Sequence, residues 1–129
     1  MSLRNRDRSP RNERPADLQS ERDSTIVGWT SFGASRDADA PANTGEIMAI
    51  YLAPEAWSSG VGRALWLAAL DRMTAQGFTT VTLWVIAGNA RAIRFYTAAG
   101  FAAEPLSLKT FTLGGVLLEE IRYGRTIDS

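Results

Sequence analysis

The stretch EIMAIYLAPEAWSSGVGRALW (residues 46–66) joins a nearly continuous apolar run to a segment with helical spacing. The run at residues 46–52 ends just before Pro54 and is typical of a strand buried on both faces. A short turn follows, and Gly60 and Gly62 stand where the helix opens. Glycines allow a ligand to approach the backbone, and the unpaired N–H groups of a first helical turn attract an anion. The junction therefore predicts a pyrophosphate-binding strand–turn–helix unit, with a plain tight turn as the alternative.

Two other phosphate-binding motifs do not fit this junction. The phosphate loop of ATPases requires Gly-Lys followed by Ser or Thr, whereas Arg63 and Ala64 follow Gly62 here. The dinucleotide-binding fingerprint requires a third Gly or Ala where Leu65 stands, and an acidic residue in the next strand. Residues 80–85 contain no acidic residue, so this motif is excluded as well.

The segments around the junction alternate between strand and helix patterns. Strands are expected at residues 25–32, 46–52 and 79–86, and in a hairpin of residues 108–113 and 116–123 around a Gly-Gly pair. Helices are expected from residue 60 to about 76 and from residue 89 to 99. Gly77 and Gly100 suit the helix ends, Asn89 suits a helix N-cap, and the polar residues 33–44 form a loop. The order predicts an α/β domain.

The first 24 residues differ in composition from the rest of the chain. They contain six arginines, five acidic residues and only four apolar residues. So little apolar surface cannot offset the entropy lost on ordering, and we predict a mobile polar arm over residues 1–24. A basic arm for an acidic partner is the alternative, although its acidic residues leave it nearly neutral. The folded domain is expected at residues 25–125.

The 129 residues include no cysteine and no histidine, which excludes several kinds of chemistry. Disulfides, thiol nucleophiles, thiolate metal sites and the Ser-His-Asp triad are ruled out, and no metal is expected. Any catalysis must use carboxylates, tyrosines, hydroxyls, water or backbone dipoles. The 14 basic and 14 acidic residues argue against nucleic-acid binding. No apolar run is long enough for a membrane span and no signal peptide is visible, so we expect a cytoplasmic protein without membrane partners.

A second segment, LWVIAGNARAIRFYTAAGF (residues 83–101), adds to the junction. It combines an apolar strand, Asn89, Ala92, the pair Phe95-Tyr96 and a closing Gly-Phe. With the junction, this segment resembles the GNAT superfamily of acyl-CoA-dependent N-acyltransferases over about residues 25–125. The resemblance implies the GNAT α/β fold with a mixed sheet, acetyl-CoA as co-substrate, and a small-molecule or peptide amine as acceptor.

The resemblance also implies how acetyl-CoA binds. Backbone groups of Ile50, Tyr51 and Leu52 would pair with the pantetheine arm. The pyrophosphate would lie against the turn and the first helical residues, namely Trp57, Ser58, Ser59, Gly60, Val61, Gly62 and Arg63. Asn89 would contact the cofactor arm, with a plain helix cap as the alternative.

Two residues carry the chemistry that the resemblance implies. Tyr96 would lie near the thioester sulfur and protonate the leaving thiolate, with a core aromatic as the alternative. Glu46 stands six residues before Leu52, where the histone-acetyltransferase branch has its general base; an edge glutamate in solvent is the alternative. A base is needed because an amine with a pKa of about 10.4 is protonated at neutral pH. Strand alternation would place Glu46, Met48 and Ile50 on one face.

The chain departs from the family pattern at two places. Trp57 stands where the family usually has Gln or Arg. The family fold also opens with a strand and two helices, and most of these are expected to be missing here. We expect an N-acetyltransferase in which the amine attacks the thioester directly in a ternary complex. A shortened, catalytically idle acyl-CoA-binding module is the alternative, and a domain that binds no CoA is a third hypothesis. A shortened fold would expose a sheet edge or apolar surface, which favours a homodimer.

Overall fold

The computed structural model describes residues 2–4, 16–22, 25–56 and 59–127. Within them, eight strands form one sheet in the order β1-β2-β3-β4-β5-β8-β6, and β7 pairs with β8. The strands are β1 (Ser2–Arg4), β2 (Ala16–Arg22), β3 (Thr25–Ala34), β4 (Thr44–Leu52), β5 (Thr80–Ile86), β6 (Ala102–Ala103), β7 (Lys109–Leu113) and β8 (Val116–Thr126). The helices are η1 (Pro54–Ala56), α1 (Val61–Ala75) and α2 (Ala90–Ala98). None of the helices in these ranges has the length and apolar character needed to cross a bilayer.

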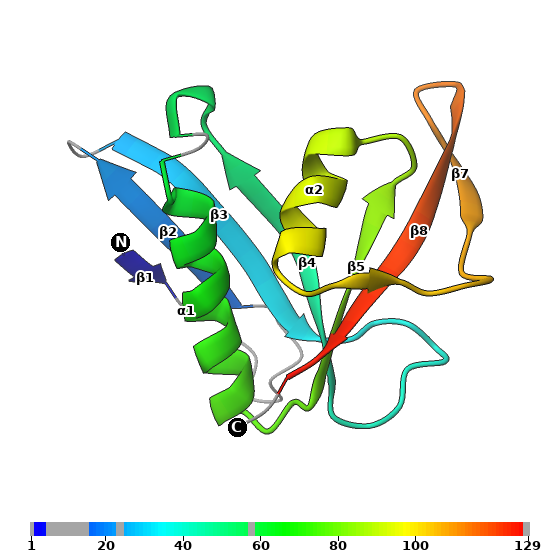
Figure 1. The fold of residues 1–129 in the computed structure, drawn as a ribbon, viewed down its shortest axis with the longest axis horizontal. Helices are drawn as coiled ribbons and strands as arrows, with labels where there is room; N and C mark the ends of the chain where they lie inside the picture. Colours follow the sequence, from blue (N-terminus) through cyan, green and yellow to red (C-terminus); the bar gives the residue numbers. More distant parts are fainter. Residues whose placement is uncertain (1, 5–15, 23–24, 57–58, 128–129) are drawn as a thin grey trace.

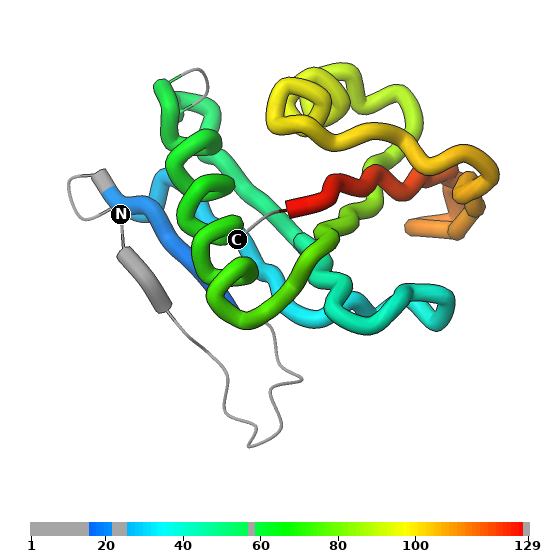
Figure 2. The backbone as a smooth tube through the Cα atoms, turned by 60° about the horizontal axis from the view of Figure 1, so that its bottom comes forward, coloured from blue at the N-terminus to red at the C-terminus, as the bar shows by residue number. Residues whose placement is uncertain are grey.

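Both α-helices lie on one face of the sheet (Figures 1 and 2). Helix α1 packs on β2, β3 and β4. It buries Leu65, Trp66, Ala69 and Met73, and β5 adds three alternate residues to the same core, Val81, Leu83 and Val85. Because side chains alternate along a strand, Thr82, Trp84 and Ile86 of β5 belong to the opposite face. The core therefore lies between the sheet and the helices, and the other face is free to form a separate site.

The elements predicted from residue 25 onward are confirmed. Gly77 and Gly100 end the two helices in the left-handed conformation, with φ of +92° and +95°. The Asn89 side chain caps α2 by accepting a hydrogen bond from the Ala92 N–H at 3.2 Å. Gly114 and Gly115 both have positive φ at the turn between β7 and β8, as a tight hairpin requires.

The prediction of a mobile arm is wrong for Ala16–Arg22. This segment is strand β2, antiparallel to β3, with Leu18 opposite Thr30. Ala16, Leu18 and Ser20 are buried on alternate positions, and Leu18 has no exposed surface. Two apolar side chains suffice here because β3 and α1 supply the rest of the core. Residues 5–15 lie outside the described residues, and the two α-helices of the described chain both follow β4.

The sheet forks between β4 and β5. Among the described strands, all pairs are antiparallel except this one, which is parallel and joins Thr44–Ile47 to residues 80–83. Beyond Ile47, β4 continues to Leu52 beside β3, whereas β5 continues to Ile86 beside β8. The two strands therefore diverge beyond this point, and α2 lies over them (Figure 1).

A β-bulge at Met48 corrects the predicted facing of β4. Ile47 pairs with Phe32 but Ala49 pairs with Ser31, so β4 gains one residue over β3 at this point. Ile47 joins the core, and Ile50 and Leu52 pack against it on the helix side. The expectation that Glu46 and Ile50 share a face is therefore wrong. The bulge reverses the alternation that a regular strand would keep.

Candidate active site

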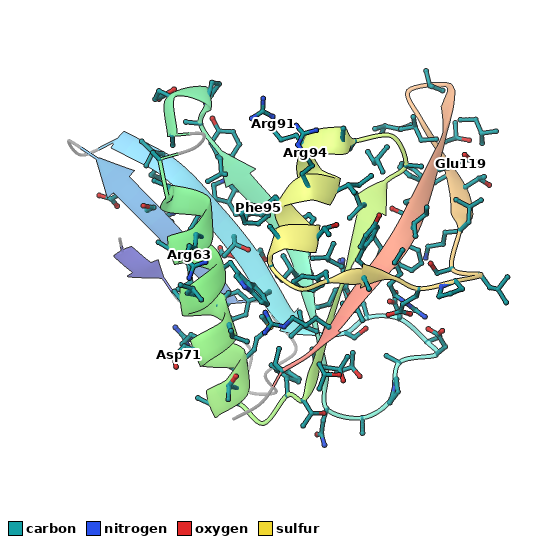
Figure 3. The ribbon with its side chains drawn as sticks, in the orientation of Figure 1. Arg63, Asp71, Arg91, Arg94, Phe95 and Glu119 are labelled. Atoms are coloured by element: carbon teal, nitrogen blue, oxygen red, sulfur yellow. The ribbon has the colours of Figure 1, made fainter. Side chains whose placement is uncertain are left out.

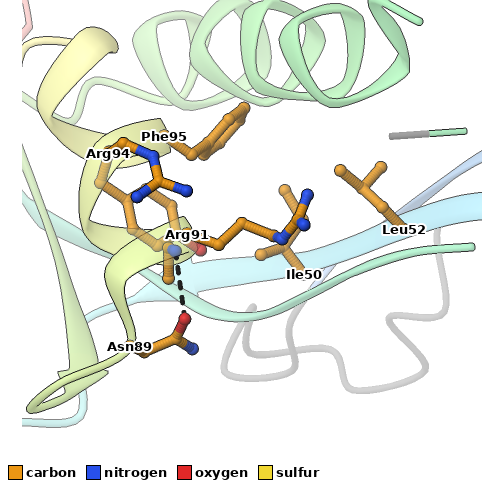
Figure 4. A pocket seen from close by; sticks show the side chains of 8 residues that line it. Ile50, Leu52, Asn89, Arg91, Arg94 and Phe95 are labelled. Atoms are coloured by element: carbon orange, nitrogen blue, oxygen red, sulfur yellow. Dashed lines mark hydrogen bonds between the residues drawn. The ribbon is translucent and has the colours of Figure 1, made fainter. Parts of the chain in front are cut away.

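A cavity of about 440 Å³ lies at the fork, between β4 and α2 (Figure 4). Its lining residues are Ile50 and Leu52 from β4, and Asn89, Arg91, Ala92, Arg94, Phe95 and Tyr96 from α2. Four of the residues predicted to bind the cofactor or to act in catalysis thus meet in one cavity.

The edge of β4 that faces this cavity has no neighbouring strand. Pairing with β5 stops at Ile47, so Ile50 and Tyr51 keep a strand partner on the β3 side alone. Backbone N–H and C=O groups must find partners, and an extended ligand laid along such an edge provides them. The Ile50 side chain is half-buried and forms part of the cavity wall, whereas the Tyr51 side chain is exposed. A ligand in the cavity would therefore lie along the backbone of these two residues.

Among the described residues, the N–H groups at the N-terminus of α1 have no partner. The first intrahelical hydrogen bond runs from the Ala64 N–H to the Gly60 carbonyl at 3.0 Å, and Gly60 at the N-cap has no side chain to cap the helix. The N–H groups of Val61, Gly62 and Arg63 therefore have no partner within the helix. Gly60 has a φ of +88° with open space around it, as a turn exposed to a ligand requires. Trp57 and Ser58 lie outside the described residues; Ser59 is exposed, with its N–H and hydroxyl bonded to the Ala56 carbonyl.

Gly62 has a packing role that the sequence did not show. A Cβ atom at this position would lie 3.0 Å from side-chain carbons of both Leu52 and Phe95. The glycine therefore lets α1 approach β4 and α2 closely. Gly62, the second glycine of the junction, is therefore required for close packing inside the protein.

Two arginines line the cavity, and a third lies on the neighbouring helix α1. Figure 3 shows Arg63 on α1 and Arg91 and Arg94 on α2, on either side of Phe95. All three arginines are exposed, and Arg91 and Arg94 line the cavity itself. Neither Arg91 nor Arg94 belongs to a motif that predicts a site residue, although their spacing of three on one helix places them on the same side. Unpaired helical N–H groups and arginines together suit phosphate groups, so this site fits the charge of CoA.

Tyr96 combines a buried ring with a cavity-lining position. It is 8% exposed and makes edge contacts with Phe95 and Phe101, at centroid distances of 5.2 and 5.9 Å. Burial raises the pKa of its phenol to about 12, which keeps the hydroxyl protonated at neutral pH. In the described residues no group forms a hydrogen bond with that hydroxyl. A protonated phenol at a cavity wall can donate a proton.

Glu46 lies in a different cavity, on the face of the sheet opposite the helices. It is 2% exposed, which excludes an edge glutamate in solvent. The Arg36 backbone N–H donates to Glu46 Oε1 at 2.9 Å, and the Arg36 guanidinium donates to Oε2 at 3.1 Å. This cavity measures about 520 Å³ and is also lined by Trp84 and Lys109. Glu46 and Tyr96 thus face the two sides of the fork rather than one common pocket.

Comparison with known proteins adds an independent line of support. The model of the acetyltransferase (GNAT) family matches residues 3–101. A mycothiol acetyltransferase of Sanguibacter keddieii is 43% identical over 94 residues, which make up 71% of this chain and 30% of that protein. The uncharacterized N-acetyltransferase YuaI of Bacillus subtilis is 35% identical over 100 residues, or 78% of this chain and 56% of that protein. The chain thus spans less than a third of the first relative and just over half of the second.

Solved structures share the fold. The PaiA N-acetyltransferase of Thermoplasma acidophilum, solved in complex with coenzyme A, has a TM-score of 0.68 at 25% identity, covering 88% of this chain and 61% of that one. The putative acetyltransferase YncA of Salmonella typhimurium, solved with acetyl-CoA, has a TM-score of 0.75 at 24% identity, covering 88% and 65%. The chain therefore shares its overall fold with one protein solved with coenzyme A and one solved with acetyl-CoA.

Proposed function

Because this chain belongs to the GNAT acetyltransferase family, we propose that it transfers an acetyl group from acetyl-CoA to a primary amine. The observation that carries the proposal is the cavity at the fork, where the unpaired edge of β4 meets Tyr96 and two arginines. When bound there, acetyl-CoA supplies an activated acetyl group as a thioester. The proposal includes a ternary complex with direct attack by the amine, and a cytoplasmic location.

Three parts of the chain would hold the cofactor. Backbone groups of Ile50 and Tyr51 would pair with the pantetheine arm, and the Leu52 side chain would pack against it. The N–H groups at the start of α1 would bind the pyrophosphate, together with Arg91 and Arg94. Asn89 already caps α2 through its side-chain oxygen, so its contribution to the cofactor would be secondary.

Glu46 and Tyr96 would serve as base and acid on the two sides of the fork. Glu46 would take a proton from the acceptor ammonium, directly or through water, so that the neutral amine can attack. Tyr96 would give its proton to the leaving thiolate, since its phenol is protonated at neutral pH. Their placement on opposite faces means that the acceptor and the cofactor would enter from opposite sides of the sheet.

Two measurements test this function. Isothermal titration calorimetry with CoA tests binding, and a thiol-release assay with acetyl-CoA and a panel of amines tests turnover. Gly60→Asp places a negative charge at the start of α1 and should weaken CoA binding at least tenfold, whereas Gly60→Ala controls for backbone strain alone. CoA binding without turnover across a wide panel would favour the idle module. If calorimetry detects no CoA binding, and the titration of Gly60→Asp is the same as that of the unmodified protein, the protein is a domain that binds no CoA.

A homodimer is also part of the proposal. The β7–β8 hairpin and the turn before it expose five aliphatic side chains, Leu106, Leu108, Leu113, Val116 and Leu117. Apolar surface grouped in this way favours contact with another chain. Sedimentation velocity at micromolar concentration tests this, and a clean monomer would count against it.

A further inference from the structure

The cavity around Glu46 has both a charged and an apolar wall. Its charged residues are Arg36, Asp37, Glu46, Lys109 and Glu120, and its apolar side chains include Met48, Trp84, Ile86 and Phe111. The Lys109 ammonium lies 4.0 Å from the centre of the Trp84 ring, and Lys109 is opposite Glu120 in the β7–β8 register. Such a cavity can bind a ligand that has a small polar group attached to an apolar part.

Arg36 and Glu46 present complementary groups side by side. The guanidinium is 67% exposed at the side chain, and the carboxylate is 3% exposed, with 3.1 Å between Nη2 and Oε2. A guanidinium has five N–H donors, and one of them bonds to Glu46 in the described residues. The others can bind an oxygen of an incoming molecule while Glu46 receives its amino group.

Hydrogen bonds from Arg122 of β8 hold the loop that contains Arg36 in place. The Arg122 guanidinium bonds to Asp37 at 3.2 Å and to both oxygens of Asp39 at 2.9 and 3.0 Å. The Trp84 indole N–H also donates to Asp37 at 3.2 Å. Because Asp37 follows Arg36 directly, these contacts hold the Arg36 backbone where its N–H reaches Glu46. The pair is therefore positioned before any acceptor arrives.

We propose that this cavity accepts an amine that carries a carboxylate or carbonyl oxygen next to its amino group, with Arg36 as the residue that selects it. The inference rests on the proposed function, since it takes Glu46 as the base. The amino group would lie at Glu46, the neighbouring oxygen at the Arg36 guanidinium, and the remaining side chain against Met48, Ile86 and Phe111. Free amino acids and peptide N-termini share the required chemistry.

A matched series of acceptors tests this selection. L-phenylalanine, L-phenylalaninamide, the peptide Phe-Ala-Ala and phenethylamine share the ring and the amine, and phenethylamine lacks the neighbouring oxygen. At saturating acetyl-CoA, kcat/KM for the first three should exceed that for phenethylamine by about ten- to a hundredfold, as expected for a charge-assisted hydrogen bond. The amino acid and the peptide distinguish the two sources of the acceptor.

Arg36 variants test the residue itself. Arg36→Gln should lower kcat/KM for phenylalanine about tenfold or more relative to kcat/KM for phenethylamine, and Arg36→Lys should restore part of this preference. Arg72→Gln, in the last turn of α1, is the matched control and should change neither. Equal use of phenethylamine and phenylalanine by the unmodified protein would overturn the proposal, as would an equal loss on every acceptor in Arg36→Gln.

A readout of binding keeps this test separate from the proposed function. If no acceptor is acetylated, the proposed activity fails, but calorimetric titration of the same compounds into the CoA-saturated protein still measures the selection. Tighter binding of phenylalaninamide than of phenethylamine, lost in Arg36→Gln, would support the inference. Equal binding of the two would refute it.

Discussion

Replacing Leu18 with alanine tests whether residues 16–22 are part of the fold. Leu18 lies in β2 with no exposed surface, opposite Thr30 of β3 and on the side covered by α1. The sequence composition alone predicts an arm in solvent, where this substitution would have no effect. The structure predicts a large loss of stability.

The size of that loss follows from the burial of the side chain. Leu→Ala removes three carbon groups, each contributing about 0.8 kcal/mol when buried, or about 2.4 kcal/mol in total. The cavity left in a well-packed site raises the expected loss to about 3–5 kcal/mol. With a urea m-value of about 1–2 kcal/mol/M for a domain of this size, the unfolding midpoint should fall by roughly 2 M. Equilibrium urea denaturation followed by tryptophan fluorescence measures this shift.

Leu106→Ala is the matched control for this substitution. At a protein concentration where sedimentation shows a monomer, Leu106 is fully exposed, at 103% of the reference value, so the same chemical change there should alter the free energy of unfolding by less than about 0.5 kcal/mol. If Leu18→Ala and Leu106→Ala unfold at the same urea concentration as the unmodified protein, β2 does not contribute to the core. The reasoning from burial would then be wrong for this strand.

Three further predictions concern the site and its support. Tyr96→Phe should lower kcat about 10²- to 10⁴-fold at nearly unchanged stability below pH 10. Burial raises the Tyr96 pKa from near 10 to about 12, so the unmodified protein should lose stability as pH rises through this window, and thermal melts of Tyr96→Phe should lack that loss. Gly62→Ala should lower the free energy of unfolding by about 1–2 kcal/mol, since its methyl would crowd Leu52 and Phe95; an unchanged melting temperature would contradict this packing. Arg122→Gln should raise the pKa of Asp39, which Arg122 holds below its usual range, and NMR titration of that carboxyl measures the change.

Much of the fold could be predicted from the sequence because its signals are local. Turn glycines, the Asn89 cap and the change from strand to helix period each depend on a few adjacent residues. The resemblance to the family, rather than a local signal, marked Ile50, Leu52, Asn89 and Tyr96, and these four residues line the cavity at the fork. Local signals therefore located the elements, and the resemblance pointed to residues that lie together.

The parts that the sequence did not predict depend on contacts between distant segments. Strand β2 is stabilised by the surface of β3 and α1 rather than by its own composition, so its two apolar residues gave too weak a signal. The bulge at Met48 is visible only once β3 and β4 are paired. Arg36 reaches Glu46 from a polar loop ten residues earlier, where nothing in the local pattern marks it as part of a site.

The bulge and the fork together explain why the two titratable groups face different sides of the sheet. A regular β4 would turn Ile50 to the same side as Glu46 and would leave β4 paired with β5 along its length. The bulge turns Ile50 toward α2, and pairing between β4 and β5 ends at Ile47. Under the proposed mechanism, the base Glu46 and the acid Tyr96 would then act from opposite faces of the sheet. The acceptor and the cofactor would therefore not compete for one pocket.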